Sequence, residues 1–329
     1  MAPGNHLVGK QESLMQDGIF VGGVNRSGTT LLTDLMGMHP EFSPIYDTDY
    51  IVEMAEILFG CPEMSGEETI DRIMGMVDAW SLNLPVLPSN RAEHERYYHG
   101  PNYVLFDRDH VMRGTLDLLR NIVSRHPLTC FREYMDTLFA AHLEWDRKPR
   151  WINKVTAYVR CPNFLHTLYP DMRFLHCVRD GRDVARSLEK LSLGQINLPT
   201  STQVWADGVM DAVRFELANP GQTLVVRYED LVRFPVETLN RAFRWLEVEP
   251  CGQQVMETWT RAGHRIDTTR VGLWVTEMDS ASNHTYWAAN GNLLRSMGYY
   301  PEPVGTLQSQ PLTVPIHGPV HEMLQGLTP

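Results

Sequence analysis

The stretch that decides the fold is Ile19-Phe20-Val21-Gly22-Gly23-Val24-Asn25-Arg26-Ser27-Gly28-Thr29-Thr30-Leu31-Leu32. Its pattern predicts a short buried strand, a tight glycine turn and the start of a helix, which we expect to run over 29–38. Backbone N–H groups in such a turn and at a helix N-terminus converge on one point and can bind phosphate there. We therefore expect a phosphate-binding turn between the strand and the helix.

This turn differs from the loop of ATP- and GTP-hydrolysing proteins. That loop needs a Lys directly after its second glycine. Gly23 and Gly28 have the required spacing, but Thr29 stands where the Lys belongs, and Arg26 supplies a cation earlier in the turn. The sequence favours a nucleotide other than ATP and leaves a P-loop-type nucleotide kinase or NTPase as the alternative.

A second strand–turn–helix pattern lies at 172–188. Arg179 ends the predicted strand, and Ser187 follows it by eight positions, about two helical turns. A guanidinium and a hydroxyl are both suited to binding a phosphate group. Two phosphate-binding turns in one chain suit a ligand with two separate phosphate-like ends.

The pattern along the chain predicts an α/β fold. Apolar runs at 19–23, 42–46, 151–154, 172–178 and 223–227 alternate with helical patterns, which predicts a parallel sheet of about five strands with helices on both faces. Residues 48–148 are mostly helical in pattern, and we expect an insertion over the C-terminal edge of the sheet, where such sheets bind ligands. Residues 301–329 form a Pro/Gly-rich tail. We expect a single domain over 1–329.

Composition excludes several classes of protein. The formal net charge of −11 argues against general nucleic-acid binding, which needs a basic face. No apolar run reaches the roughly 18 residues of a membrane span. Five cysteines without a C-x-x-C pair disfavour a disulfide framework or a zinc site, and no acidic or histidine cluster has metal-ligand spacing. With no signal-peptide pattern before the first strand, these features predict a cytoplasmic protein that uses no metal.

The two phosphate motifs and the pieces between them resemble the sulfotransferases that use 3′-phosphoadenosine 5′-phosphosulfate (PAPS). The sequences of these motifs are most similar to those of the tyrosylprotein sulfotransferases and related bacterial enzymes. The resemblance runs in order from about residue 19 to about residue 300. The resemblance implies PAPS as donor, 3′-phosphoadenosine 5′-phosphate (PAP) as product and no obligatory metal. The matching pieces are R-S-G-T-T-L, His39-Pro40, Asn153-Lys154, Leu168-Tyr169-Pro170, V-R-D-G-R and Tyr228-Glu229-Asp230-Leu231.

The resemblance also assigns residues to the two ends of the donor. One group would hold the 5′-phosphosulfate, with Lys154 at the bridging oxygen, and a second would hold the 3′-phosphate and adenosine. The first group is Arg26, Ser27, Gly28, Thr29, Thr30 and Lys154, and the second is Arg179, Ser187, Tyr228 and Arg270, the last in a late segment that closes over the donor.

The general base implied by the resemblance is Asp47. Small-molecule sulfotransferases place a His two residues after the strand-three lysine, and here that position is Thr156. The tyrosylprotein enzymes use a Glu eight residues after the His-Pro pair, and ungapped counting from His39-Pro40 places Asp47 there, with Asp49 as the alternate. We expect Asp47, Lys154 and Arg26 to be catalytic. Asp47 could also cap the helix expected from Tyr50, and His39 is expected to be structural.

The acceptor is expected to lie beside Asp47. Between Arg26 and Arg72 the chain has ten acidic residues and no Lys or Arg, which is either a solvated helical face or an acceptor site. We predict that Tyr46, Asp49, Tyr50 and Glu53 contact a neutral or cationic small molecule. This acceptor would be a specialised metabolite of natural product biosynthesis, sulfated on a hydroxyl or a nitrogen.

Several alternatives stay open. A protein-tyrosine sulfotransferase is the alternative for the acceptor, although those secretory-pathway relatives are membrane-anchored and should present basic residues to an acidic peptide. A member that binds the nucleotide without turnover is another alternative. The sequence also leaves open whether the chain is a monomer or a homodimer.

Overall fold

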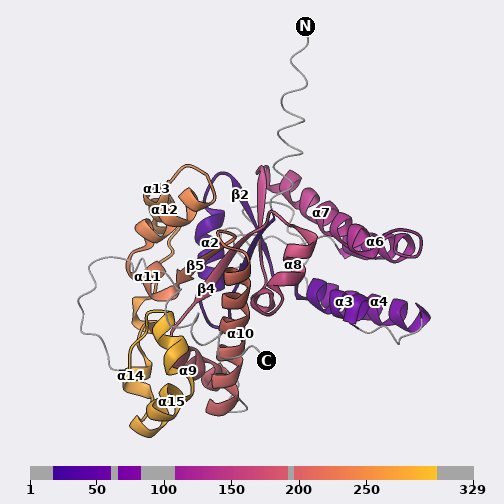
Figure 1. Ribbon diagram of the computed structural model, residues 1–329. Helices are drawn as coiled ribbons and strands as arrows, with labels where there is room; N and C mark the ends of the chain where they lie inside the picture. The colour runs from indigo at the N-terminus through magenta and orange to yellow at the C-terminus, as the bar shows by residue number, and fades with distance from the viewer. Residues whose placement is uncertain (1–17, 61–65, 83–107, 192–195, 302–329) are drawn as a thin grey trace. The chain divides into compact units, whose positions relative to one another are not determined.

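The structure is a computed structural model that describes residues 18–60, 66–82, 108–191 and 196–301 (Figure 1). Five parallel strands form one sheet in the order β2-β3-β1-β4-β5. The strands are β1(Ile19–Gly22), β2(Phe42–Tyr46), β3(Arg150–Lys154), β4(Arg173–Val178) and β5(Thr223–Arg227). The predicted α/β fold is confirmed, with every expected strand found within a residue or two of its expected bounds.

The helices fill the segments between the strands. From β1 to β4 they are α2(Thr29–Gly37), α3(Asp49–Gly60), α4(Gly66–Leu82), α6(Arg108–Asn121), α7(Pro127–Asp146), the 3₁₀ turn η1(Thr156–Arg160) and α8(Pro162–Leu168). After β4 they are α9(Gly181–Leu191), α10(Leu198–Ala218), α11(Tyr228–Arg233), α12(Pro235–Trp245), α13(Gly252–Arg261), the 3₁₀ turn η2(Thr268–Arg270), α14(Trp274–Glu277) and α15(Ser280–Ser296). The predicted first helix is confirmed as α2.

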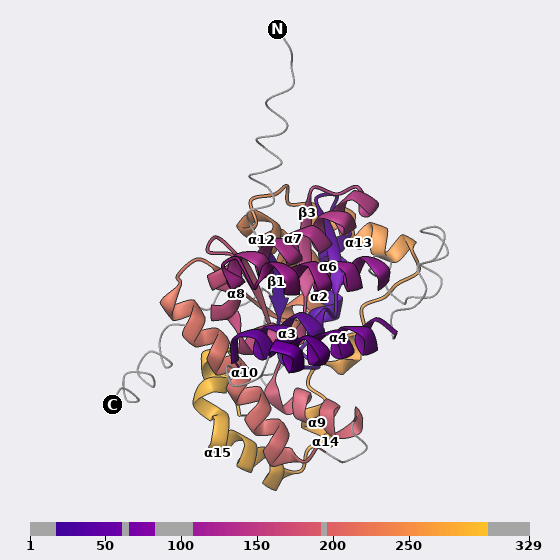
Figure 2. The same cartoon turned by 90° about the vertical axis from the view of Figure 1, so that its right-hand side faces the viewer.

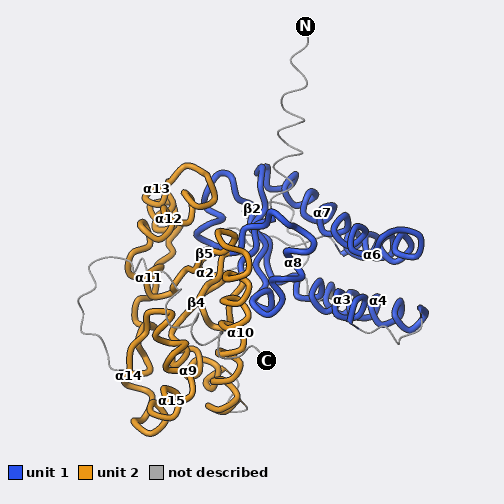
Figure 3. Tube along the Cα trace, in the orientation of Figure 1, with its two compact units in different colours: residues 1–21, 33–174 blue, residues 22–32, 175–329 orange. Residues whose placement is uncertain are grey.

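The chain divides into two compact units, which Figure 3 shows in two colours. Unit 1 comprises residues 1–21 and 33–174, and unit 2 comprises residues 22–32 and 175–329. The glycine turn therefore belongs to unit 2 although it follows the first strand of unit 1. That the whole chain is one domain stays a prediction.

Strand register in unit 1 aligns the ends of two strands. In the parallel pair β2 and β3, Phe42 lies opposite Arg150 and Tyr46 lies opposite Lys154, while β1 pairs Val21 with Lys154 from the other side. All residues of the three strands β1, β2 and β3 are buried. Lys154 and the residue after Tyr46 therefore leave the sheet at the same edge, where parallel sheets bind ligands.

An aromatic cluster packs β1 and β3 against the helices of unit 1. The buried ring of Phe20 packs edge-on against Trp151, Tyr158 and Tyr169, with centroid distances of 5.3, 5.3 and 5.4 Å. Phe139 of α7 adds a further edge contact to Trp151 at 4.8 Å. Edge-to-face pairs of this kind contribute about 0.5–1.5 kcal/mol each beyond the buried area, so they stabilise the packing of β1 on β3.

The predicted helical insertion is found in the described part of 48–148. Helices α3, α4, α6 and α7 pack in succession, each on the next, and α7 also contacts β2 and β3 (Figure 2). Within the insertion, residues 61–65, which include Cys61, and residues 83–107 lie outside the described residues. Of the tail predicted at 301–329, residues 302–329 also lie outside them. Across the helices that are described, none is both long and apolar enough to cross a membrane.

Unit 2 is organised around helix α9. Helices α10, α14 and α15 pack on it, and the buried indole of Trp205 in α10 donates a hydrogen bond of 3.0 Å to the carbonyl of Arg179. This contact fixes the backbone between the end of β4 and the start of α9. Arg179 and Ser187 thus stand on a rigid turn and helix, as the strand–turn–helix pattern predicts.

Candidate functional site

The glycine turn of unit 2 has the backbone of a phosphate-binding loop. Arg26 and Gly28 both have positive φ, 75° and 90°, and the amide of Ser27 donates to the carbonyl of Val24 at 3.0 Å. A Cβ atom on Gly28 would lie 2.4 Å from Cδ2 of Tyr228, so only glycine fits there. The turn therefore brings its backbone against Tyr228 just before α2 begins.

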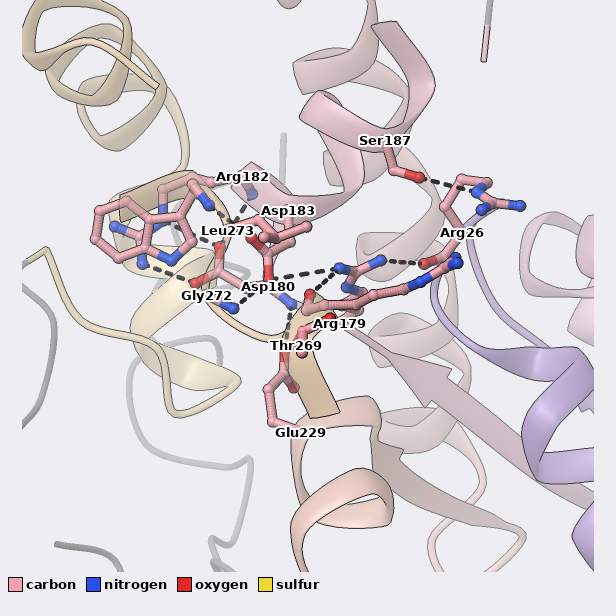
Figure 4. Close-up of polar contacts among 12 residues, drawn as sticks. Arg26, Arg179, Asp180, Arg182, Asp183, Ser187, Glu229, Thr269, Gly272 and Leu273 are labelled. Carbon is pink, nitrogen blue, oxygen red and sulfur yellow. Dashed lines mark hydrogen bonds and ion pairs between the residues drawn. The ribbon is translucent and has the colours of Figure 1, made fainter. Parts of the chain in front are cut away.

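The turn and the second motif meet in the same unit, as Figure 4 shows. The Arg26 Nε donates to Ser187 Oγ at 2.9 Å, and Arg179 Nη1 donates to the Arg26 carbonyl at 3.1 Å. From the end of β4, Cys177 Sγ contacts the Ser27 carbonyl at 2.9 Å. Two segments about 150 positions apart in sequence are therefore joined directly, through both backbone and side chains.

The Arg26 side chain connects the two groups of residues that the resemblance assigns to opposite ends of the donor. We assigned Arg26 to the 5′-phosphosulfate and Ser187 to the 3′-phosphate, but the two side chains share a hydrogen bond. The exposed guanidinium of Arg26 lies in the pocket of Arg179 and Ser187. Its catalytic role stays a prediction.

The pocket formed at this meeting point is strongly basic. It has a volume of about 370 Å³, and its cationic side chains outnumber the acidic ones, Asp183 and Glu277, by five to two. Arg179 Nε and Arg186 Nε are buried there without a hydrogen-bond partner among the described residues. Buried guanidinium groups beside a hydroxyl are the donor set that a phosphate requires. The cations of the pocket are Arg26, Arg179, Arg186, Lys190 and Arg270.

A late segment closes one side of this pocket. The buried carboxylate of Asp183 accepts hydrogen bonds from the amides of Gly272 and Trp274 at 2.8 and 2.9 Å, and Arg179 Nη2 donates to the Arg270 carbonyl. Burial raises the pKa of Asp183, while these amides and Arg179 oppose the shift. The predicted closing segment thus lies at the pocket, and Asp183, which sequence reasoning missed, holds it there.

Tyr228 forms the wall between the turn and Arg179. It begins α11 after β5 and is 7% exposed, and its ring centre lies 4.7 Å from the Arg179 guanidinium carbon. Burial raises the pKa of its hydroxyl. The ring therefore supports both the glycine turn and Arg179, which is compatible with its predicted place near the adenosine.

Unit 1 carries the second group of candidate residues, at the edge defined by the β2–β3 register. Lys154 Nζ donates to Asp47 Oδ1, and the backbone amide of Asp47 donates to the Lys154 carbonyl at 2.9 Å. The lysine side chain is 4% exposed and that of Asp47 is 46% exposed. Asp47 also has a positive φ of 49°, an uncommon conformation for a non-glycine residue that occurs often at functional sites.

Two further carboxyl groups lie near this pair. Tyr46 donates a short hydrogen bond of 2.5 Å to Asp34, and burial raises the pKa of Asp34 to about 6 against the opposing effects of Tyr46 and Lys154. Burial and the charge of Asp47 also raise the pKa of Asp49. Sequence reasoning missed Asp34, although an acid within the apolar pattern of α2 was a visible signal.

The predicted acceptor residues are not all presented to solvent. Tyr50 is 1% exposed, its hydroxyl lies 3.1 Å from that of Tyr134, and its ring packs on Trp80 at 4.1 Å. Tyr46 is 5% exposed and bonded to Asp34. These two tyrosines belong to the core of unit 1, whereas Glu53 is exposed and Asp49 is half-buried. Acceptor contacts by all four stay predictions.

The remaining expectations concern His39, capping and metals. His39 is buried and its Nδ1 accepts from the Glu41 amide at 3.1 Å, in keeping with a structural role. Helix α3 begins at Asp49, two residues after Asp47, rather than at Tyr50. Over the described ranges, no group of three His, Cys, Asp or Glu side chains could hold a metal ion.

A parallel α/β sheet, a glycine turn at a helix start and an adjoining basic pocket are features of the α/β proteins that bind phosphate groups. Comparison with known proteins gives the family. The sequence model of the sulfotransferase family matches residues 18–251, and the chain belongs to that family. The resemblance stated from the sequence is confirmed.

Individual relatives agree with this family. Protein-tyrosine sulfotransferase A of Caenorhabditis elegans is 24% identical over 77% of this chain and 55% of its own length. Protein-tyrosine sulfotransferase 2 of Gallus gallus is 25% identical over 70% of this chain and 51% of its own length. The sulfotransferase domain of the Synechococcus PCC 7002 olefin synthase has the same fold, at 17% identity and a TM-score of 0.50 over 86% of this chain and 95% of that domain.

These relatives correct one prediction. The chain spans about half the length of the curated relatives it matches. Those relatives are protein-tyrosine sulfotransferases, the secretory-pathway group named above, so the cytoplasmic location predicted from the sequence is wrong. The prediction took the lack of a signal-peptide pattern, of an apolar run and of a disulfide framework as marks of the cytoplasm, and none of these absences determines where a protein is located.

Proposed function

We propose that this chain is a PAPS-dependent sulfotransferase. The observation that carries the proposal is the basic pocket of unit 2, in which Arg26, Arg179 and Ser187 are joined beside the glycine turn. A ligand with two phosphate-like ends would use the turn for one end and the pocket for the other. PAPS, when bound, supplies the sulfuryl group that the acceptor receives.

In this proposal, unit 2 binds and orients the donor. Arg179 and Ser187 hold the 3′-phosphate, with the buried Arg179 Nε as an unused donor. The amides and hydroxyls of Ser27 to Thr30 hold the 5′ end. Tyr228 keeps the Arg179 guanidinium in place, and Asp183 keeps the Arg270 segment against the pocket.

In this proposal, unit 1 supplies the groups that take the proton of the acceptor and stabilise the charge of the reaction. The half-exposed Asp47 carboxylate accepts the proton of the acceptor hydroxyl, and the buried Lys154 ammonium stabilises negative charge and orients Asp47 through its ion pair. A base needs access to the acceptor, whereas a charge-stabilising group needs a fixed position. The 46% and 4% exposed fractions of the two side chains fit those different roles.

For the acceptor, we propose a tyrosine of a protein or peptide first. The support is the similarity to three curated relatives whose names describe them as protein-tyrosine sulfotransferases. The neutral or cationic small molecule remains the second candidate, because Asp34, Asp49 and Glu53 surround the pair with negative charge. Such a surface should repel the acidic peptides that basic residues would select.

Donor binding is tested first. Thermal-shift and calorimetric titrations with PAP should stabilise the protein, whereas ATP with Mg²⁺ should bind weakly. The opposite order would replace the proposal by the nucleotide kinase or NTPase alternative.

An acceptor assay follows with radiolabelled PAPS. Acidic tyrosine peptides, the same peptides with Phe in place of Tyr, and cationic phenols and amines are compared. Label on the tyrosine peptides alone would support the first candidate, and label on the cationic compounds alone would support the second. PAP binding without transfer to any acceptor class would favour a protein that only binds the nucleotide.

A further inference from the structure

A buried carboxyl group on α2 has no part in the proton transfer described so far. Asp34 follows the glycine turn by six residues, is 7% exposed, and accepts a hydrogen bond of 2.5 Å from the Tyr46 hydroxyl. Tyr46 directly precedes Asp47 and lies opposite Lys154 in the β2–β3 register. The hydrogen bond therefore ties Asp34 to the strand ends that carry the proposed proton-transfer pair.

The same region contains several charges in addition to Asp34. The charges of Lys154 and Asp47 act on Asp34, and Lys154 Nζ lies 5.9 Å from the centre of the Tyr46 ring. Asp49 is under the influence of Asp47, Lys154 and Glu53. Among the titratable groups of the packed elements, Tyr46 of β2, Lys154 of β3 and Asp47 act on Asp34, whereas Glu53 of α3 and Tyr158 of η1 interact with Asp49.

We propose that Asp34 is a positioning residue for proton transfer, and that its negative charge, held by Tyr46, assists Asp47 when Asp47 takes the acceptor's proton. The inference rests on the proposed function. Lys154 and Asp47 together carry no net charge, so ionised Asp34 leaves the group with one negative charge. A nearby negative charge favours uptake of a proton and keeps the Lys154 ammonium charged.

The hydrogen bond determines when Asp34 carries that charge. Burial raises the pKa of Asp34 to about 6, and the Tyr46 hydroxyl lowers it relative to burial alone. Asp34 is therefore ionised at neutral pH and protonated in mild acid. Loss of the Tyr46 hydroxyl raises the pKa of Asp34 further, so the charge disappears at a higher pH.

The test compares two variants of this pair with a matched pair elsewhere in unit 1. Asp34→Asn keeps an acceptor for Tyr46 but removes the charge, and Tyr46→Phe keeps the carboxyl group but removes the donor. The control is Asp136→Asn, because Tyr169 donates to Asp136 at 2.8 Å and burial raises the pKa of Asp136 too. The rate of transfer from PAPS to an acidic tyrosine peptide is measured between about pH 5 and about pH 8.

We expect three different profiles. In the wild-type protein the rate falls as the pH drops through about 6. In Asp34→Asn this acidic fall is lost and the rate at neutral pH is about tenfold lower, the effect of about one pKa unit of charge interaction. In Tyr46→Phe the fall moves to higher pH, and Asp136→Asn keeps the wild-type profile. An Asp34→Asn profile that superimposes on the wild-type curve would overturn the proposal.

Direct titration separates this inference from the proposed function. The carboxyl resonance of ¹³C-labelled Asp34 is followed against pH in the wild-type and Tyr46→Phe proteins, without donor or acceptor. Titration near pH 6 with no transfer to any acceptor would refute the proposed function, and the role of Asp34 with it. Transfer with a carboxyl group that titrates at its ordinary value would refute the role of Asp34 alone.

Discussion

Substitution of Gly28 by Ala tests whether the glycine turn and the second motif form one binding surface. The new Cβ would lie 2.4 Å from Tyr228 Cδ2 and 3.0 Å from Cε2, and the residue would keep a φ of about +90°. The left-handed backbone costs about 1–3 kcal/mol for a residue with a side chain. Displacing the ring adds an overpacking cost of about 1–3 kcal/mol.

The substitution should therefore lower the free energy of unfolding by a few kcal/mol and weaken PAP binding. Tyr228 cannot move without disturbing Arg179, since the ring centre and the guanidinium carbon are 4.7 Å apart. We expect about a tenfold loss of PAP affinity, which corresponds to about 1.4 kcal/mol. Denaturant unfolding and isothermal titration calorimetry measure the two effects.

Two control variants separate the cost of the left-handed backbone from the cost of the clash with Tyr228. A Cβ added to Gly75 of α4 would meet no atom within 4 Å, so Gly75→Ala should stabilise the helix by about 0.5–1 kcal/mol. Combining Gly28→Ala with Tyr228→Ala removes the clash but keeps the backbone cost. A Gly28→Ala protein with wild-type unfolding and wild-type PAP affinity would refute the reasoning.

Three further predictions concern the candidate residues. Asp47→Asn and Lys154→Ala should each lower the transfer rate by about 10²–10⁴-fold, while calorimetry should find PAP affinity changed only a few-fold. A loss of PAP affinity as large as the loss of transfer rate would contradict their assigned roles. Arg179→Ala should weaken PAP binding by about 1.5–3 kcal/mol but leave adenosine 5′-phosphate, which lacks the 3′-phosphate, unaffected. Arg214→Ala, which removes a surface ion pair with Asp211, is its matched control in the same titrations. The pKa of Asp34 is raised from 3.8 to about 6 in the folded protein. The free energy of unfolding should therefore fall by up to about 3 kcal/mol as the pH rises from about 4 to about 6. Denaturant melts of Asp34→Asn should lack this fall.

The sequence alone was sufficient to predict the five strands and the glycine turn. Apolar runs such as Ile19 to Val21 are buried on both faces of a parallel sheet, so they predict strands without any alternation. The sequence did not show that Tyr46 would be buried, because full burial of every residue of β2 also removes the alternation that marks an exposed face. Tyr50 of α3 is likewise buried, because its ring packs on Trp80 of α4 and its hydroxyl contacts that of Tyr134 in α7.

Long-range partners were the part that the sequence did not predict. The amides of Gly272 and Trp274 donate to Asp183, about 90 positions away in the sequence. Every residue except proline has a backbone amide, so the residue types do not predict such a contact. The ion pair of Lys154 with Asp47 was not predicted from the sequence either, because it depends on the register that places Tyr46 opposite Lys154 at the ends of β2 and β3. The position of Arg26 beside Ser187 depends on a left-handed turn, whose geometry the letters R-S-G do not specify.

The left-handed backbone at Arg26 and Asp47 has a consequence for engineering this protein. A glycine at either position would relax the main chain, but a glycine at 47 would also remove the ion-pair partner of the buried Lys154 ammonium, which costs stability. A selection for heat resistance alone would therefore act against the guanidinium of Arg26, which makes an exposed hydrogen bond to Ser187, before it acts against the carboxylate of Asp47. Libraries aimed at a more robust catalyst should keep both positions fixed and seek their gains at helix ends and surface loops instead.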